Sequence, residues 1–179
     1  MNEVFPEILT ENLLLRQIVS SDLENIFAGL SHPDVIRYYG VSFATIKETK
    51  EQLNWYADLE KTGTGIWWAI CTKSEGEFLG AAGFNNLSSE NRKAEIGFWL
   101  MPRNWGKGVL TEVLPQILKY AFEVVKLHRV EAFVEEANTN CISLLNKMNF
   151  TKEGTMHDCE IKNDEFINLV IFAKLANSQ

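Results

Sequence analysis

Two closely spaced glycines separate a strand-like segment from a helix-like segment in residues 103–108, which read Arg-Asn-Trp-Gly-Lys-Gly. Glycine adopts positive φ and lets the backbone approach a ligand closely. The unpaired N–H groups and the dipole at a helix N-terminus attract anions, and Arg103 and Lys107 add positive charge. The run therefore predicts a phosphate or pyrophosphate site, with a plain structural turn as the alternative. It matches neither a P-loop nor the Gly-x-Gly-x-x-Gly spacing of a dinucleotide site.

The segments on either side of this run have the periodicities of a strand and a helix. Residues 93–101 alternate between two sides, which predicts a strand that ends before Pro102, because proline cannot donate to a sheet ladder. One side carries Ala94, Ile96, Phe98 and Leu100, and the other carries Glu95, Gly97, Trp99 and Met101. Apolar residues at helical spacing predict a helix from Val109 to Val125. Pro115 falls inside it, so we expect a kink there or a helix whose regular part starts late.

The remaining patterns give the order β-α-α-β-β-β-α-β-α-β-β. Strands are predicted at residues 13–18, 65–71, 78–84, 93–101, 129–134, 150–156 and 167–173. Helices are predicted near residues 23–30, 45–62, 109–125 and 138–148, and the first two open with capping boxes at 21–24 and 45–48. Residues 85–92 are expected to form a polar loop. The order indicates an α+β fold with a mixed sheet, and we expect residues 1–179 to form a single domain.

The composition excludes several classes of partner. The formal net charge is −7, whereas surfaces that bind nucleic acid are normally basic, so no nucleic-acid partner is expected. No apolar run is long enough to span a membrane and no secretory signal is visible, so we expect no membrane partner and a cytoplasmic location. The three cysteines and three histidines are scattered and give neither a disulfide framework nor the spacing of a metal site.

In its element order and motifs the chain resembles the GNAT (Gcn5-related N-acetyltransferase) superfamily over essentially its whole length. Within this superfamily it is most similar to the RimJ/RimL group of ribosomal-protein N-terminal acetyltransferases. The resemblance rests on Leu13-x-Leu15-Arg16, residues 95–100, Arg103-x-x-Gly106-x-Gly108, Asn138, residues 147–150 and Glu153-Gly154. It implies a mostly antiparallel central sheet with a V-shaped split between strands 93–101 and 129–134, and helices on both faces.

The same resemblance implies an acetyl-CoA site without a metal. The pantetheine arm would insert into the split and pair with the backbone around Phe98, Trp99 and Leu100. The residues expected to bind the pyrophosphate are those of the loop and the helix start, namely Arg103, Trp105, Gly106, Lys107, Gly108 and Val109. Asn138 matches a family position that contacts the pantetheine arm, and Lys147 could approach a CoA phosphate.

Direct acyl transfer to an amine needs a base for the amine proton, donors for the carbonyl oxygen and a proton for the leaving thiolate. The candidate bases are Glu95 and Glu160, and Glu160 matches a base proposed for this group; the alternative for each is a surface carboxylate or an ion pair. Cys141 occupies the position of the family's proposed acid, where serine is common, and is the candidate acid. Its alternative is a small apolar residue in a packed helix.

We therefore expect an N-acetyltransferase that uses acetyl-CoA and acts on a protein N-terminal amine, with a ribosomal protein as the leading acceptor. A polyamine such as spermidine or an amino-sugar antibiotic is the alternative acceptor. A non-catalytic acyl-CoA-binding module is the alternative from another class, and a homodimer is allowed. One or two of five aromatic residues could wall the acceptor cleft, although such residues are more often core: Tyr38, Tyr39, Trp55, Trp67 and Trp68.

Overall fold

The computed structural model describes residues 4–176, whose strands form one eight-stranded sheet with the order β1-β2-β3-β4-β5-β6-β8-β7. The strands are β1 (Ile8–Leu9), β2 (Leu13–Gln17), β3 (Ile66–Thr72), β4 (Phe78–Ser88), β5 (Lys93–Leu100), β6 (Arg129–Glu135), β7 (Thr151–Lys162) and β8 (Glu165–Leu175). Every neighbouring pair is antiparallel except β5 and β6, which are parallel. The predicted α+β class and the mostly antiparallel mixed sheet are confirmed.

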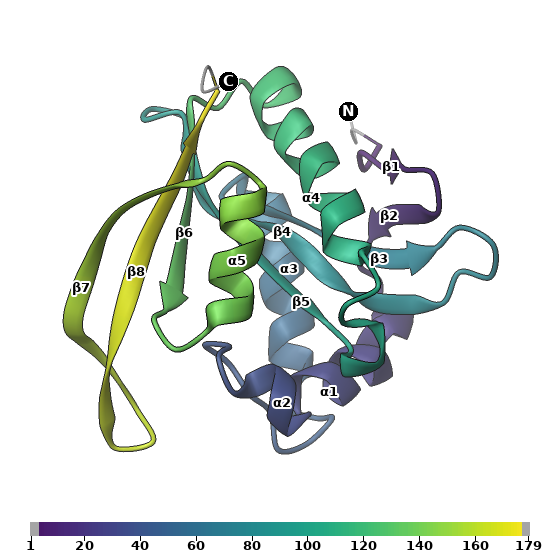
Figure 1. Cartoon of the computed structure of the whole chain (residues 1–179). Helices are drawn as coiled ribbons and strands as arrows, with labels where there is room; N and C mark the ends of the chain where they lie inside the picture. The colour runs from purple at the N-terminus through teal and green to yellow at the C-terminus, as the bar shows by residue number, and fades with distance from the viewer. Residues whose placement is uncertain (1–3, 177–179) are drawn as a thin grey trace.

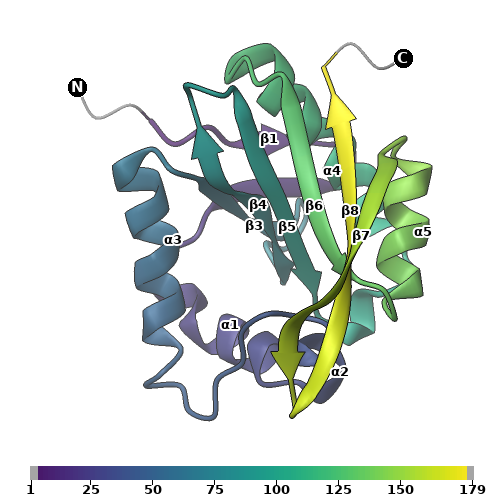
Figure 2. The ribbon, with the colours of Figure 1, turned by 90° about the vertical axis from the view of Figure 1, so that its left-hand side faces the viewer.

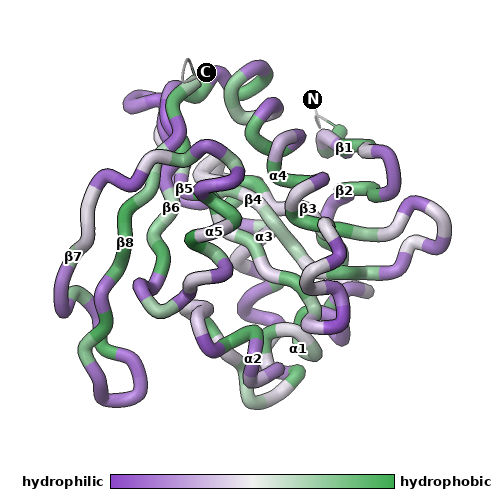
Figure 3. Tube along the Cα trace, in the orientation of Figure 1, coloured by the Kyte–Doolittle hydropathy of each residue, from purple (hydrophilic) through white to green (hydrophobic). Residues whose placement is uncertain are grey.

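Helices cover both faces of this sheet. They are α1 (Leu23–Leu30), α2 (Pro33–Ile36), α3 (Lys50–Thr62), α4 (Val109–Lys119) and α5 (Thr139–Lys147), with short helical turns η1 (Ser20–Asp22), η2 (Pro102–Asn104) and η3 (Tyr120–Val124). The first three helices lie on one face and α4 and α5 on the other (Figure 1, Figure 2). Each face has its own apolar cluster, one around Trp67 and Trp99 and one around Ile96, Ile117 and Leu145. Figure 3 shows that the turns joining β3 to β4 and β7 to β8 are hydrophilic.

β5 and β6 pair at one end and diverge at the other. Their parallel ladder has three pairs, from Lys93↔Arg129 to Glu95↔Glu131, although β5 continues to Leu100 and β6 to Glu135. Beyond these pairs β5 stays bonded to β4, and β6 stays bonded to β8. The predicted V-shaped split is therefore confirmed, and α5 lies in front of the gap in Figure 1.

Ion pairs hold the closed end of the split. Lys93 Nζ lies 3.0 Å from Glu131 Oε2, and Arg129 Nε lies 2.8 Å from Glu131 Oε1. Arg129 also donates to both carboxylate oxygens of Glu153 on β7. Burial opposes ionisation of Glu131, but hydrogen bonds from Arg129 and Lys93 outweigh it and lower the pKa of this carboxyl.

Local signals set several element ends as predicted. Gly63, at φ +69°, ends α3, and Pro102 begins η2 directly after β5. α4 begins at Val109, so the expectation of a late start is wrong. Pro115 lies on the exposed side of α4, and the departure from α-helical geometry comes later, as the π-helical turn η3. No helix within residues 4–176 is long and apolar enough to cross a membrane.

Other expectations about local structure need correction. β4 runs on to Ser88, so the first half of the predicted loop at 85–92 is strand and residues 89–92 form the turn. β1 and α2 escaped prediction because two and four residues are too short to show a period. The first capping box is wrong, since the Asp22 carboxylate accepts the Val19 N–H at 2.9 Å and pairs with Arg16. In the second, Thr45 Oγ1 accepts the Glu48 N–H at 3.2 Å as expected, but regular helix begins only at Lys50.

The contact between α1 and β5 gives a test of the packing on the face of the sheet that α1 to α3 cover. A Cβ atom on Gly29 would lie 2.1 Å from Cζ3 of Trp99, a ring that is itself buried. Gly29→Ala should therefore lower the free energy of unfolding by about 2 kcal/mol despite the better helix propensity of alanine. Gly40→Ala, where a Cβ meets nothing within 4 Å, is the control and should change it by less than about 0.5 kcal/mol. Urea denaturation measures both, and equal midpoints would contradict the packing.

Candidate functional site

A cleft of about 1310 Å³ passes through the split in the sheet and is lined from both faces. We call the part on the side of α4 and α5 the donor half, after the acetyl donor that the family resemblance implies. It includes Phe98, Gly106, Gly108, Asn138, Cys141 and Lys147. We call the part on the side of α1 to α3 the acceptor half, after the amine that would accept the acetyl group. It includes Tyr39, Trp55, Trp67, Glu95 and Glu160. Every residue predicted to bind acetyl-CoA or to act in catalysis lines this cleft except Arg103 and Lys107. Of the five aromatic candidates, Trp68 does not line it, because its ring packs in the core on the other face of the sheet. The structure thus brings together the two candidate bases, Glu95 and Glu160, which are 65 positions apart in the sequence.

The edge of β5 that faces the gap presents backbone groups without a sheet partner. The Met101 N–H donates to the Leu79 carbonyl at 2.9 Å, and bonded and non-bonded pairs alternate along an antiparallel ladder. Trp99 therefore bonds to β4, whereas Phe98 and Leu100 turn their N–H and C=O groups toward the gap. The Leu100 carbonyl accepts the indole N–H of Trp105 at 2.9 Å. Both backbone groups of Phe98 and the N–H of Leu100 are left to pair with an inserted ligand.

The turn before α4 exposes a set of backbone donors. Gly106 and Gly108 have φ values of +70° and +80°, a region that strains residues with a side chain. Gly108 is the N-cap of α4 and no side chain caps this end. Within residues 4–176 no protein group accepts the N–H groups of residues 106–111. Together with the helix dipole, these donors form an anion cradle at the predicted place.

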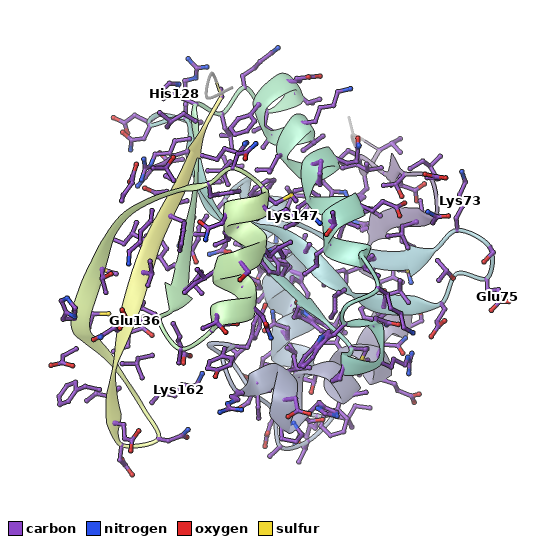
Figure 4. The ribbon with its side chains drawn as sticks, viewed as in Figure 1. Lys73, Glu75, His128, Glu136, Lys147 and Lys162 are labelled. Carbon is purple, nitrogen blue, oxygen red and sulfur yellow. The ribbon has the colours of Figure 1, made fainter. Side chains whose placement is uncertain are left out.

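The positive charge near the cradle differs in origin from what the sequence suggests. The Arg103 guanidinium lies 3.0 Å from Glu77 Oε1, and both side chains are exposed outside the cleft. Lys107 is also exposed and does not line the cleft. Lys147, from α5, does line it and is labelled in Figure 4. The cationic side chain in the donor half is therefore Lys147.

The start of α5 places two predicted residues in the donor half. Asn138 is the N-cap, and its Oδ1 accepts the backbone N–H of Cys141 at 3.2 Å. The amide oxygen of Asn138 therefore orders the helix start as well as lining the cleft. Burial raises the pKa of the Cys141 thiol to about 12, so this thiol stays protonated at neutral pH.

Glu95 lies at the point where the split begins, on the acceptor face. Its Oε2 accepts the Asn86 Nδ2–H at 2.9 Å, and its side chain is half-buried. Burial, then the neighbouring Tyr56 and the charge of Glu95, raise the pKa of Tyr39 well above its ordinary value. Tyr39 is consequently a neutral phenol beside a carboxylate in the wall of the cleft.

Glu160 reaches the same half from the β7–β8 hairpin. The register between β7 and β8 shifts between Met156 and Glu160, and the Asp158 N–H within this bulge donates to Asn168 Oδ1 at 2.9 Å. Bulges of this kind redirect the side chains beside them. The Glu160 side chain is exposed and lines the cleft.

Lys162 fixes the end of that hairpin against the rest of the acceptor half. Its Nζ donates to the Arg37 carbonyl at 2.6 Å and to Glu135 Oε1. Figure 4 shows this side chain extending from the hairpin toward α2. Sequence reasoning missed Lys162 and the Asn86 partner of Glu95, because the groups that they contact lie far away in the chain or leave no local pattern.

Two other points concern the predicted site. Trp99 lines the cleft but is 4% exposed, and its indole Nε1 lies 3.3 Å from the Tyr56 hydroxyl. Its side chain therefore belongs to the hydrophobic core below the acceptor half. Within residues 4–176 there is no group of three or more His, Cys, Asp or Glu side chains arranged to hold a metal ion.

Comparison with known proteins identifies relatives that share this architecture. The family profile described as "Acetyltransferase (GNAT) domain" matches residues 12–151. The uncharacterized N-acetyltransferase YoaA of Bacillus subtilis is 35% identical over 161 residues, which cover 89% of this chain and 91% of that protein. The crystal structure of a GNAT-family acetyltransferase from Bacillus anthracis superposes with a TM-score of 0.85 at 25% identity, covering 97% of this chain and all of that one.

More distant relatives differ in acceptor. A ribosomal-protein-serine acetyltransferase of Escherichia coli is 28% identical over 107 residues, 59% of each chain. A spermidine N-acetyltransferase from Vibrio cholerae, solved in complex with CoA and spermine, has a TM-score of 0.82 at 19% identity and covers 92% of this chain and 95% of its own. The second likeness concerns the fold alone.

The burial of Cys141 leads to a test with a thiol reagent. Only the thiolate reacts, and a pKa of about 12 leaves a thiolate fraction on the order of 10⁻⁴ at pH 8. Cys71 is buried with a raised pKa, whereas Cys159 is exposed. Iodoacetamide at pH 8 should therefore label Cys159 first, and peptide mass mapping should find Cys141 at least about 100-fold slower. Urea-unfolded protein, labelled at all three cysteines, is the control, and equal rates in the folded protein would contradict the burial.

Proposed function

Because the chain belongs to the GNAT acetyltransferase family, we propose that it transfers the acetyl group of acetyl-CoA to the N-terminal amine of a protein in the cytoplasm. A ribosomal protein is the proposed acceptor, as in the RimJ/RimL group. The observation that carries the proposal is the single cleft that joins the donor half to the acceptor half through the split. A reaction between two bound substrates needs such a passage, because holding both in line removes a large entropic barrier.

The donor half fits acetyl-CoA. The free N–H groups of residues 106–111 would bind the pyrophosphate, and the unpaired edge of β5 at Phe98 would pair with the amides of the pantetheine arm. Lys147 would meet a phosphate group. The fit rests on orphaned backbone donors, which are costly to leave unpaired away from water.

In the proposed reaction the neutral amine nitrogen attacks the thioester carbonyl carbon, the C–N bond forms and the C–S bond breaks. Glu160 accepts the proton whose loss converts the ammonium group into the neutral amine, and solvent takes the second proton from the nitrogen after the attack. Backbone N–H groups of β5 stabilise the developing negative charge on the carbonyl oxygen. Glu95 holds the incoming ammonium group before it loses that proton. The departing sulfur leaves as a thiolate.

Cys141, the candidate acid, is proposed to donate a hydrogen bond to the leaving sulfur, because burial keeps its thiol protonated. A thiol with a pKa of about 12 gives up its proton less readily than an ordinary thiol, whose pKa is about 8.5. Its contribution is therefore a hydrogen bond to the leaving sulfur, and solvent completes the protonation.

A polyamine acceptor is the second candidate, because the acceptor half carries the negative charge that a polycationic amine needs. Asp34, Glu51, Glu95 and Glu160 line that half, against one unpaired basic side chain, Arg37, among the described residues of this wall. An acidic wall attracts any cationic amine and does not by itself separate a polyamine from a peptide N-terminus.

Turnover tests the function together with the cradle. The protein is mixed with acetyl-CoA and a panel of N-terminal peptides of ribosomal proteins, spermidine and an aminoglycoside, and free CoA thiol and acetylated product are measured. We expect acetylated peptide. Gly106→Val should weaken CoA binding at least about 100-fold, because a side chain at positive φ is strained and would project into the cradle.

Gly76→Val is the matched control, since Gly76 has φ +68° and equally open surroundings but lies in the turn after β3. It should keep the affinity for CoA. If spermidine is the one compound of the panel that is acetylated, the acceptor is a polyamine and not a protein N-terminus. If CoA binds tightly and no product forms, the protein is a non-catalytic acyl-CoA-binding module. Unchanged affinity in Gly106→Val would contradict the cradle.

Variants of the two carboxylates separate their proposed roles. Glu160→Gln should lower kcat about 100-fold with the affinity for CoA unchanged, because it removes the base. Glu95→Gln should act mainly by raising KM for the amine, about tenfold, because it removes the charge that holds the ammonium group. The reverse pattern would exchange the two roles.

A further inference from the structure

The acceptor half contains one buried hydrogen-bond donor that the protein leaves unsatisfied. Trp67 is 4% exposed and lines the cleft, and its indole Nε1 has no hydrogen-bond partner within residues 4–176. Buried polar groups are nearly always paired, and an exception calls for a specific explanation. A donor that faces a ligand cleft indicates a partner that arrives with the ligand.

Three other tryptophans differ from Trp67 in this respect. The Trp68 N–H donates to the Pro6 carbonyl at 2.7 Å, on the opposite face of the sheet. The N–H groups of Trp99 and Trp105 have acceptors at 3.3 and 2.9 Å. Trp67 is therefore the buried indole donor that the described residues leave unpaired, whereas Trp55, which also lines the cleft, is exposed.

The position of Trp67 is fixed by the strands beneath it. Trp67, Gly83 and Gly97 are in register on β3, β4 and β5. A Cβ atom on Gly83 would lie 2.6 Å from Trp67 Cγ, and one on Gly97 would lie 2.7 Å from Cη2 and 2.8 Å from Cζ2. The indole thus lies flat across two glycines and reaches β5. Nε1 is two bonds from Cζ2, so the donor lies close to the strand that borders the split.

Neighbouring rings keep the indole from turning away. The ring centroids of Trp55 and Tyr56 lie 5.7 and 5.3 Å from that of Trp67. Gly97 comes two residues after Glu95, the last residue of β5 that pairs with β6. The N–H is therefore held at the place where the sheet opens, on the side where the amine would enter.

We propose, on the basis of the proposed acetyl transfer, that Trp67 is a positioning residue that donates its indole N–H to an oxygen atom beside the reacting amine. The acceptor that satisfies it is an amine whose neighbouring carbon carries a carbonyl group, as at a peptide N-terminus. A protonated polyamine presents only donors and leaves Trp67 unpaired. A site with an unpaired donor rejects a substrate that lacks the matching group.

Indole N–H resonances in ¹⁵N NMR test the contact without turnover. The protein is saturated with CoA, and Trp67→Phe identifies the Trp67 signal by its loss. Alaninamide should move this signal downfield as the hydrogen bond forms. The matched amine 3-methylbutan-2-amine, in which methyl groups replace the oxygen and the amide nitrogen, should not. An unmoved signal with alaninamide, whether or not it binds, overturns the proposal.

A third probe separates a carbonyl from a hydroxyl group, which an amino sugar would offer. 3-Aminobutan-2-ol carries an amine beside a hydroxyl and should shift the Trp67 signal less than alaninamide at equal occupancy. An equal shift would overturn the selection for a carbonyl group.

Kinetics provide the second readout. Trp67→Phe keeps the ring and removes the donor, so kcat/KM for alaninamide should fall about tenfold while that for 3-methylbutan-2-amine changes less than about twofold. Trp68→Phe, whose N–H serves the opposite face, should leave the ratio of the two unchanged. Equal losses for both amines would reduce Trp67 to a packing role. If no amine is turned over, the proposed function fails, and the NMR shift still decides whether Trp67 binds the carbonyl group.

Discussion

The short parallel ladder between β5 and β6 is the constraint on which the site depends. It stops after three pairs, whereas each strand is bonded along its other edge, β5 to β4 and β6 to β8, by seven pairs each. Neither strand can turn to close the gap without breaking its own ladder. The ion pairs of Glu131 with Lys93 and Arg129 hold the narrow end, so the divergence starts at a defined residue. The unpaired backbone at Phe98 is therefore a fixed feature of the fold.

The acceptor half shows a second constraint, which is the fit of large rings against glycine. Trp67 lies over Gly83 and Gly97, and Trp99 lies against Gly29 of α1. In each case a Cβ atom would overlap the indole, so the ring position and the glycine depend on one another. Aromatic rings packed in this way do not rearrange easily. A hydrogen-bond donor on such a ring keeps its direction, and a fixed direction is what discrimination between amine substrates needs.

The parts of the site that the sequence predicted are those built from neighbouring residues. The turn with Gly106 and Gly108 and the strand before it carry their own periodicity, so the cradle could be placed without knowledge of the fold. Arg103 shows the limit, because a motif gives the residue type but not the direction of its side chain, and this one pairs with Glu77. Glu160 depends on a bulge, and periodicity cannot show two extra residues in one strand. Which residues bind substrate, and whether the chain is one domain from 1 to 179, stay predictions.

The two halves of the cleft are built differently, and this affects how the sequence determines which amine is acetylated. The donor half uses backbone groups of one continuous segment, in which Gly106 and Gly108 adopt the positive φ that the cradle needs. The acceptor half is assembled from the segment around Tyr39, from β3 and β5, and from the β7–β8 hairpin, which Lys162 ties to the Arg37 carbonyl. Substitutions in any one of these segments can alter its shape and charge while the cradle stays intact. Relatives with one fold can therefore act on different amines, and the acceptor of each must be inferred from the side chains of its acceptor half.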